Sequence, residues 1–231
     1  MQTMPRLIAG VVFVVVGWGL LAGTTVPAGT TVPAGTAEPL KPVVLPAPQM
    51  DKGRPLMQVL NDRQSRRDIS PDKKLALQEL SNLLWAACGI NRPDSGKRTA
   101  PTASNRQEID VYVATAEGVF LYDVKGHRLE PVLQEDIRKA AGKQAFVQTA
   151  PMVLIFVVDE ERMGGRSESD KAFYAATDTG FVSQNVYLYC ASEGLATVVI
   201  GMVDKPALAA AMKLRPEQKV ILTQPVGYPA K

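Results

Sequence analysis

The stretch PMVLIFVV (residues 151–158) decides the fold, because it holds no polar side chain and is rich in Val and Ile. A continuous apolar run of this kind, bounded by proline and acidic residues, is typical of a strand buried on both faces. Such a strand needs further strands beside it and helices over both faces. We therefore expect a central sheet covered by helices.

The segments around this run alternate between strand and helix patterns. Strands are expected at 108–115, 196–201 and 218–229, and a hairpin at 118–132 turns at Lys125 and Gly126. Helices are expected at 55–63, 70–90, 135–150, 178–194 and 205–214. The helix at 70–90 begins at Pro71 with Ser70 as its N-cap. The sequence therefore predicts an α+β domain with one sheet.

The first fifty residues differ from the rest of the chain. Leu7–Gly23 (LIAGVVFVVVGWGLLAG) is uncharged and apolar and follows Arg6, which is typical of an export signal or a short membrane anchor. Residues 24–50 repeat GTTVPA and are rich in proline, which predicts an extended linker. We expect a folded domain at 51–231, exported to the periplasm or anchored to the outer face of the inner membrane.

Composition and charge exclude several function classes. The chain has 26 Lys and Arg against 23 Asp and Glu, too balanced for an electrostatic nucleic-acid binder. Cys88 and Cys190 lie far apart with no C-x-x-C, which argues against a zinc site. His127, the only histidine, is expected to be a solvated turn residue, so a histidine-dependent nucleophile is not indicated. Catalysis would then depend on a bound cofactor.

The stretch NDRQSRR (residues 61–67) is the main candidate for binding a phosphate. Neither G-x-x-x-x-G-K-[ST] nor G-x-G-x-x-G occurs in the chain. In an extended segment Arg63, Ser65 and Arg67 point to one side and Arg66 to the other. Guanidinium and hydroxyl donors then converge just before the helix expected at Pro71. A solvated basic surface patch is the alternative interpretation.

Three segments, taken together and in order, resemble a known family. They are RQSRR (63–67), APTASNRQEIDVYV (100–113) and DTGFVSQNVYLYCASEGLATVVIGMVD (178–204). Over residues 51–229 the chain resembles the FMN-dependent nitroreductases, and LSNLLWAACGINR (80–92) is similar to their SagB-like and ThcOx-like branch. The resemblance implies a nitroreductase-like three-layer α/β/α sandwich with a mixed, mainly antiparallel sheet. It also implies an intertwined homodimer with flavin bound between subunits.

The same resemblance implies a set of FMN contacts. The first segment would hold the phosphate, the second the flavin and ribityl chain, and the third the ring near its reactive nitrogen. The implied residues are Arg63, Gln64, Ser65, Arg67, Pro101, Thr102, Ala103, Asn105, Gln107, Ile200, Gly201 and Met202. Phe181, Val182, Tyr187 and Leu188 would be core or interface. Ala103 stands where the family often has serine, and many relatives continue into a C-terminal basic arm for which Lys231 is the candidate substitute.

The function implied is an FMN-dependent oxidoreductase that passes hydride or electrons from a nicotinamide or another donor to a nitro, quinone or similar small-molecule acceptor. Residues 159–174 are expected to form a lid over the flavin. The alternative is a non-catalytic exported protein that binds flavin or another phosphorylated ligand. Oxidation of a peptide azoline is a third, less favoured activity.

Overall fold

The computed structural model describes residues 38–231, which form one compact unit. The predicted signal or anchor (1–23) and residues 24–37 of the predicted linker lie outside the described residues. The remaining linker residues belong to the fold: β1 (Val43–Val44) pairs with β6 (Arg128–Leu133), and Leu45 is buried. The domain therefore begins before Asp51, because a short apolar run between prolines can close the edge of a sheet.

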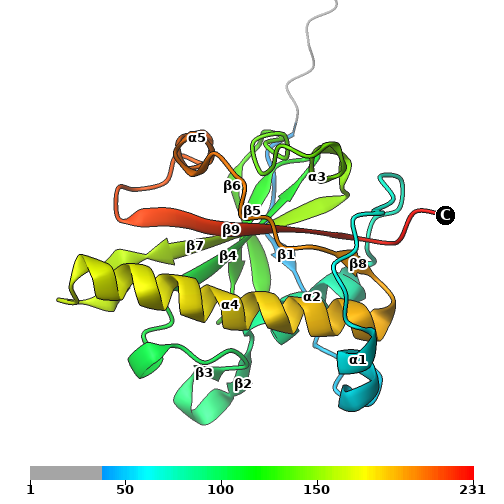
Figure 1. Cartoon of the computed structure of the whole chain (residues 1–231), viewed down its shortest axis with the longest axis horizontal. Helices are drawn as coiled ribbons and strands as arrows, with labels where there is room; N and C mark the ends of the chain where they lie inside the picture. Colours follow the sequence, from blue (N-terminus) through cyan, green and yellow to red (C-terminus); the bar gives the residue numbers. More distant parts are fainter. Residues whose placement is uncertain (1–37) are drawn as a thin grey trace, which may run out of the picture. The chain divides into compact units, whose positions relative to one another are not determined.

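The centre of the molecule is a seven-stranded sheet in the order β1-β6-β5-β4-β7-β9-β8, and all its neighbouring strands run antiparallel. The remaining strands are β4 (Ile109–Thr115), β5 (Val119–Asp123), β7 (Met152–Asp159), β8 (Ala196–Thr197) and β9 (Gln218–Gly227). Every residue of β7 is buried between β4 and β9, as its unbroken apolar run predicted (Figure 1).

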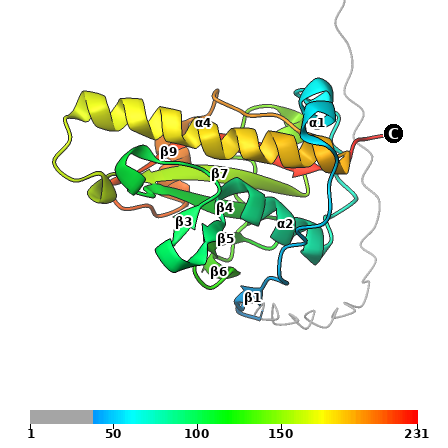
Figure 2. The ribbon, with the colours of Figure 1, turned by 90° about the horizontal axis from the view of Figure 1, so that it is seen from below.

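Helices cover both faces of this sheet. α2 (Leu77–Cys88) and α4 (Glu168–Glu193) lie on one face, and α3 (Ala145–Thr149) and α5 (Lys205–Ala211) on the other. α4 runs along the sheet (Figure 2), and α1 (Leu56–Asp62) packs against it. A small hairpin, β2 (Ile90–Arg92) with β3 (Lys97–Arg98), and three 3-10 turns were not predicted. The turns are η1 (Pro93–Ser95), η2 (Ala103–Asn105) and η3 (Glu160–Met163). The predicted α+β sandwich is confirmed.

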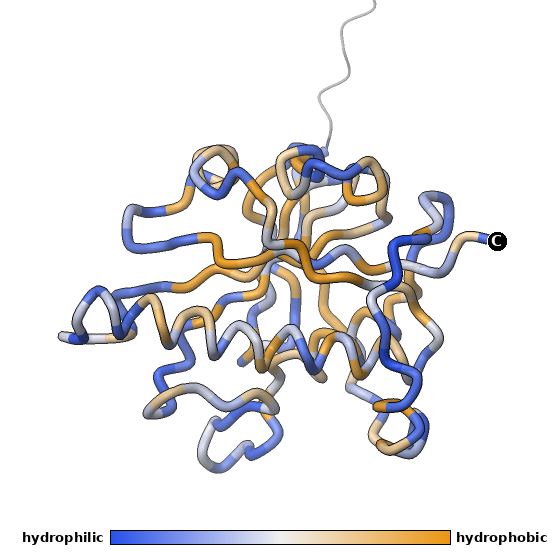
Figure 3. Tube along the Cα trace, in the orientation of Figure 1, coloured by the Kyte–Doolittle hydropathy of each residue, from blue (hydrophilic) through white to orange (hydrophobic). Residues whose placement is uncertain are grey.

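The alternating faces of the central strands build two separate cores. Leu154 and Phe156 of β7 pack toward α2 and α4, whereas Val153 and Ile155 pack toward α3 and α5. Apolar residues gather along these strands, and polar residues along the surrounding loops (Figure 3). Within residues 38–231 no helix is both long enough and apolar enough to cross a membrane.

The helix predicted from Pro71 begins six residues later than expected, at Leu77. Residues before it are tied to the end of the chain, because the N–H of Ser70 donates to the Tyr228 carbonyl at 2.8 Å and Ile69 bridges Pro229. The helix starts instead after Ala76, whose N–H donates to the Glu79 carboxylate at 2.8 Å. Ser70 is therefore not its N-cap, since its backbone belongs to an extended pairing.

Other predicted boundaries also shift. The helix predicted over 135–150 is reduced to α3, since the Ala141 carbonyl accepts the Thr223 hydroxyl at 2.7 Å. The long helix starts ten residues before Asp178, at Glu168, where the Ser167 hydroxyl accepts the N–H of Asp170 at 3.1 Å. The strand predicted over 196–201 has only two residues in β8. The predicted lid at 159–174 is largely η3 and the first turns of α4.

His127 is not the solvated turn residue that was predicted. The hairpin turn is present, but the ring points inward between β5, α2 and the segment before α1. Its Nδ1 lies 2.8 Å from the Tyr122 hydroxyl, and its Nε2 lies 2.8 Å from the Ser81 hydroxyl and 3.1 Å from the Pro46 carbonyl. Burial lowers the pKa of His127. The ring is a structural clamp on the first residues of the domain.

Candidate functional site

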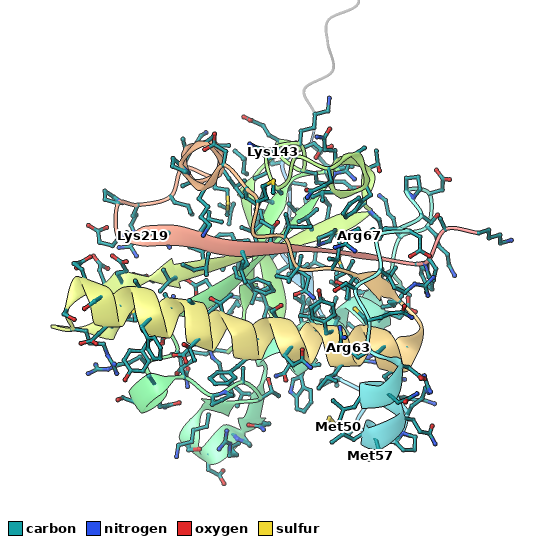
Figure 4. The ribbon with its side chains drawn as sticks, in the orientation of Figure 1. Met50, Met57, Arg63, Arg67, Lys143 and Lys219 are labelled. Atoms are coloured by element: carbon teal, nitrogen blue, oxygen red, sulfur yellow. The ribbon has the colours of Figure 1, made fainter. Side chains whose placement is uncertain are left out.

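The segment 63–67 is extended and follows α1 directly. The N–H of Arg63 ends that helix by donating to the Val59 carbonyl at 2.9 Å. The Arg63 guanidinium lies 5.4 Å from the centre of the Tyr187 ring, and the Ser65 hydroxyl lies 3.0 Å from the Tyr187 hydroxyl. Arg63 and Arg67 lie at the same end of the molecule as the C-terminus (Figure 4). The segment is thus fixed onto α4 and does not lead into a helix.

The three arginines of this segment differ in their charge partners. Arg66 is paired with the Asp68 carboxylate, and the resulting hydrogen bonds lower the pKa of Asp68. Within residues 38–231 neither Arg63 nor Arg67 forms an ion pair with a carboxylate. Arg67 and Ser65 are exposed, and Arg63 is half-buried. Two guanidinium groups and a hydroxyl therefore remain available for an anion.

The side chains of this segment make different contacts around Tyr187. Gln64 and Arg66 line a cavity of about 270 Å³ together with Tyr187, Cys190 and Leu195. The Arg63 guanidinium lies over the Tyr187 ring, and the Ser65 hydroxyl lies beside the Tyr187 hydroxyl. Arg66 differs from Arg63 in being held by an ion pair with the exposed carboxylate of Asp68.

The segment 200–202 leaves the sheet edge next to segment 63–67. The Arg66 N–H donates to the Thr197 carbonyl at 2.9 Å, which ties the two chain segments together. Ile200 is buried and bridges Thr223 of β9, whereas Met202 is 69% exposed. A methyl group built on Gly201 would meet only a side-chain atom of Leu222 at 3.7 Å. The backbone after Ile200 is therefore open to a flat ligand.

Tyr187 joins these two segments and was missed as a site residue. Its hydroxyl accepts the N–H of Val199 at 2.8 Å and lies 3.0 Å from the Ser65 hydroxyl. The residue is buried, so the sequence assigned it to the core or an interface. One property of the residue could have indicated this role, because a tyrosine hydroxyl usually has a hydrogen-bond partner when it is buried.

The loop 101–107 holds the remaining predicted residues. Ser104, Asn105 and Gln107 all have positive φ, at 57°, 53° and 52°. This left-handed conformation is unfavourable for residues other than glycine and persists only when contacts enforce it. The Gln107 N–H donates to the Thr102 hydroxyl at 2.9 Å, and its side-chain amide donates to the Gly96 carbonyl at 2.9 Å. The conformation of the loop is thus held by hydrogen bonds within the loop and by one to Gly96.

This loop contacts α4 at a different place from segment 63–67. The N–H of Ala103 donates to the Asp178 carboxylate at 2.9 Å. Asp178 and Tyr187 are nine residues apart, which is roughly 14 Å along the helix and about half a turn around it. Pro101 and Asn105 are exposed. The structure therefore brings segments 63–67 and 200–202 together, and places loop 101–107 on the other side of α4.

The described residues contain neither a metal-binding cluster nor a reactive thiol. Among residues 38–231 no group of three or more His, Cys, Asp or Glu side chains could hold a metal ion. Burial raises the pKa of the Cys88 thiol to about 12 and raises that of Cys190 as well, which makes both poor nucleophiles. A cavity of about 590 Å³ lies between α4, α5 and β9, but none of the predicted site residues lines it.

Sequence comparison places this arrangement in a family. The profile of the nitroreductase family matches residues 60–228, which includes all three segments. The chain belongs to the nitroreductase family. A protein of Methanocaldococcus jannaschii that is named as a nitroreductase is 34% identical over 183 residues, covering 74% of this chain and 90% of its own. Membership of this family makes the protein a flavin-dependent oxidoreductase in general class.

Solved structures of nitroreductase-family proteins share the fold. A crystal structure from Ralstonia eutropha JMP134 is 40% identical, covers 82% of this chain and 90% of its own, and has a TM-score of 0.79. The NADPH:FMN oxidoreductase of Vibrio harveyi, solved with NAD+, is 18% identical over 76% of this chain, 69% of its own, with a TM-score of 0.58. At that identity the likeness concerns the fold alone.

The residues present fit a flavin mononucleotide. A phosphate needs donors whose charge is not already neutralised, and Arg63 and Arg67 meet that requirement together with the exposed hydroxyl of Ser65. An isoalloxazine ring needs a flat backbone approach, and Gly201 leaves one open. The donor set and the open backbone are adjacent, since Tyr187 ties both to α4.

Proposed function

We propose that the protein is an FMN-dependent oxidoreductase that transfers hydride or electrons from a nicotinamide or another donor to a nitro, quinone or similar acceptor. Family membership supports the general class. The observation that carries the cofactor assignment is the pair of arginines, Arg63 and Arg67, which have no carboxylate partner within residues 38–231 and lie beside an open glycine backbone. When bound, FMN would supply the hydride chemistry, which agrees with the absence of a metal-binding cluster and of a reactive thiol from the described residues.

The chain's residues have distinct tasks in this proposal. Arg63, Ser65 and Arg67 bind the phosphate by charge-assisted hydrogen bonds, with Gln64 contributing its backbone N–H. Ile200, Gly201 and Met202 would hold the ring, and the Gly201 N–H would donate to the nitrogen that accepts hydride. Tyr187 fixes the spacing between these two segments. Loop 101–107 contributes Pro101, Thr102, Ala103, Asn105 and Gln107 to the flavin and the ribityl chain.

The placement of these segments supports a homodimer. Within one protomer, the α4 residues that contact loop 101–107 and segment 63–67 are half a helical turn apart. A second copy of the chain could supply the loop to a flavin held by segment 63–67. We propose that each flavin lies between two protomers, one giving segments 63–67 and 200–202 and the other giving loop 101–107.

The setting and the branch are also proposals. The apolar run at 7–23 favours export, with the domain in the periplasm or tethered to the outer face of the inner membrane. The stretch 80–92 favours the SagB-like and ThcOx-like branch. The microcin synthetase complex McbBCD of Escherichia coli contains a chain of this fold, at 19% identity, 73% and 70% coverage and a TM-score of 0.66.

The first test is the visible spectrum of the purified protein. We expect flavin absorption bands, either as isolated or after addition of FMN, that bleach anaerobically with NADH or NADPH and recover on addition of a nitroaromatic or quinone. A protein that takes up no FMN contradicts the proposal. A protein that binds FMN but is reduced by no donor supports the non-catalytic alternative.

Mixing two defective variants tests the shared site. One carries Arg63→Ala with Arg67→Ala, and the other carries Asn105→Ala in loop 101–107. Random mixing of two-fold dimers gives roughly a quarter of sites in which both segments are intact. Recovery of FMN binding to that level supports a site built from two protomers, and no recovery after demonstrated subunit exchange contradicts it.

A further inference from the structure

Two buried carboxyl groups lie beneath loop 101–107. Glu108 follows the loop directly, immediately before β4, and is 1% exposed. Asp178 lies in the middle of α4 and is 2% exposed. Burying a negative charge is costly unless donors compensate it. Two such groups facing each other therefore require a specific explanation.

The two carboxyl groups are unequally supplied with donors. Asp178 accepts the N–H of Ala103 at 2.9 Å. No group within residues 38–231 donates to either carboxyl oxygen of Glu108, although the Asp178 carboxyl lies within hydrogen-bonding range of it. Two carboxylates can only accept hydrogen bonds, so a proton on one of them supplies the missing donor.

The surrounding charges do not remove the need for that proton. Arg162 of η3 faces the pair, but it donates to main-chain carbonyls, including that of Glu108, and to the Asp110 carboxylate at 2.6 Å. Asp159 at the end of β7 adds a further negative charge, 3.7 Å from the Nε of Arg162. Burial, reinforced by Asp178, raises the pKa of Glu108 to about 7.

We propose that Glu108 and Asp178 share one proton, and that this acid–carboxylate pair holds loop 101–107 in its left-handed conformation through the N–H of Ala103. The two residues are positioning residues, because they act on the loop from below and do not reach its exposed side. The effect on the cofactor rests on the proposed function, whereas the effect on the loop does not.

The pair makes loop order depend on pH. Below neutrality the proton bridges the two side chains, and Asp178 stays aligned with Ala103. When the proton is lost, two buried negative charges repel, and the acceptor for the Ala103 N–H moves or becomes hydrated. The folded-state pKa of Glu108 is raised from its ordinary 4.5 to about 7. The pair therefore stabilises the fold fully below pH 4.5, and this stabilisation is lost progressively as the pH rises from 4.5 to about 7.

Amide hydrogen exchange, measured by NMR on the protein without added FMN, tests the proposal. We expect protection of the Ala103 amide, corrected for intrinsic exchange, to fall by up to about tenfold per pH unit between pH 4.5 and about 7, and to level off above that. In Glu108→Gln the side-chain amide donates to Asp178 at every pH, so protection should stay constant. Glu135→Gln, at an exposed site, is the control and should behave like the wild type.

Several outcomes decide the matter. The proposal is overturned if the wild type shows no change between pH 4.5 and about 7, or if Glu108→Gln shows the same change as the wild type. Should Glu108→Gln not fold, Asp178→Asn gives the same answer, since its amide accepts from Ala103 and donates to Glu108. If exchange changes with pH but FMN affinity does not, the pair is upheld and the loop is not part of the cofactor site.

Discussion

Segment 63–67 and loop 101–107 are built in opposite ways. The first carries its chemistry in side chains: Arg63 and Arg67 have no ion-pair partner in the described part of the chain, and the backbone is simply extended. The second depends on its backbone conformation, in which three non-glycine residues have positive φ. Hydrogen bonds with Gly96, Arg162 and Asp178 hold this conformation. Binding determinants of the first kind tolerate changes around them. Those of the second kind depend on residues distant in sequence.

The largest effect is expected where the chemistry lies in exposed side chains. Replacing Arg63 and Arg67 together by alanine should weaken FMN binding by about 3 kcal/mol or more, since a charge-assisted hydrogen bond contributes about 1.5 to 3 kcal/mol. The free energy of unfolding should fall by only about 0.5 to 1 kcal/mol, because neither residue forms an ion pair in the described structure and only the contact of Arg63 with the Tyr187 ring is lost. Titration followed by flavin fluorescence measures the affinity.

The matched control is Arg66→Ala, in the same segment. Arg66 is already neutralised by Asp68, so FMN affinity should be preserved. Equal losses in the control and in the double variant would show that the segment acts only through its net charge.

Tyr187→Phe should have the next largest effect. It removes the hydroxyl that joins Ser65 to the Val199 N–H but keeps the ring under Arg63. We expect a loss of about 1 kcal/mol in unfolding free energy, because the partly buried N–H of Val199 loses its acceptor. FMN affinity should fall as well, which calorimetry of binding would measure.

Tyr189→Phe on the same helix separates these two effects. Its hydroxyl donates to the Glu79 carbonyl at 3.1 Å, away from both site segments. A comparable stability loss with unchanged FMN affinity is expected. If both tyrosine variants reduce affinity equally, the loss reflects α4 stability and the joining role of Tyr187 is wrong.

Gln107→Ala probes the backbone-determined loop. It removes hydrogen bonds to the Gly96 carbonyl and the Asn105 side chain but keeps a residue that disfavours positive φ. A loss of about 1 kcal/mol in denaturant unfolding is expected. Arg106→Ala, an exposed neighbour, should be neutral. A neutral Gln107→Ala would mean that the main-chain contacts with Thr102, Arg162 and Asp178 are enough to hold the loop.

The smallest effect on stability is expected at Gly201→Ala. The added methyl group meets only Leu222, at 3.7 Å, and Gly201 does not have a positive φ. Thermal unfolding should give a change within about 0.5 kcal/mol. A lower FMN affinity in this otherwise unaltered fold would place the flavin ring against residue 201, and an unchanged affinity would count against that placement.

The sequence predicted the sheet and its flanking helices because the spacing of apolar residues reflects which face of each element is buried, whatever the element packs against. The unbroken run 151–158 became β7, and a helix lies within or overlaps each of the five predicted ranges, although only Ala145–Thr149 is helical within 135–150. The predicted helix boundaries were wrong where residues hydrogen-bond to partners distant in sequence. Ser70 pairs with Tyr228, and Ala141 pairs with Thr223. His127 was misplaced because its partners, Ser81 and Pro46, lie far from the turn in sequence.

For the candidate site, the sequence identified residues with chemical groups of their own. Arg63, Ser65 and Arg67 could be proposed from their side chains and spacing. The roles of Tyr187, Glu108 and Asp178 could not, because each depends on which backbone segment the fold places beside it. The positive φ angles of Ser104, Asn105 and Gln107 could not be predicted either, because none of these residues is a glycine.

The short strands at the two edges of the sheet have a consequence for aggregation. β1 covers β6 at one edge with only two residues, between Pro42 and Pro46, and β8 is equally short at the other. Brief, proline-flanked edge strands discourage pairing with strands of other molecules. Cutting the chain at Asp51 would remove β1 and the Pro46 contact of His127, and would leave β6 open as a template for intermolecular β-pairing.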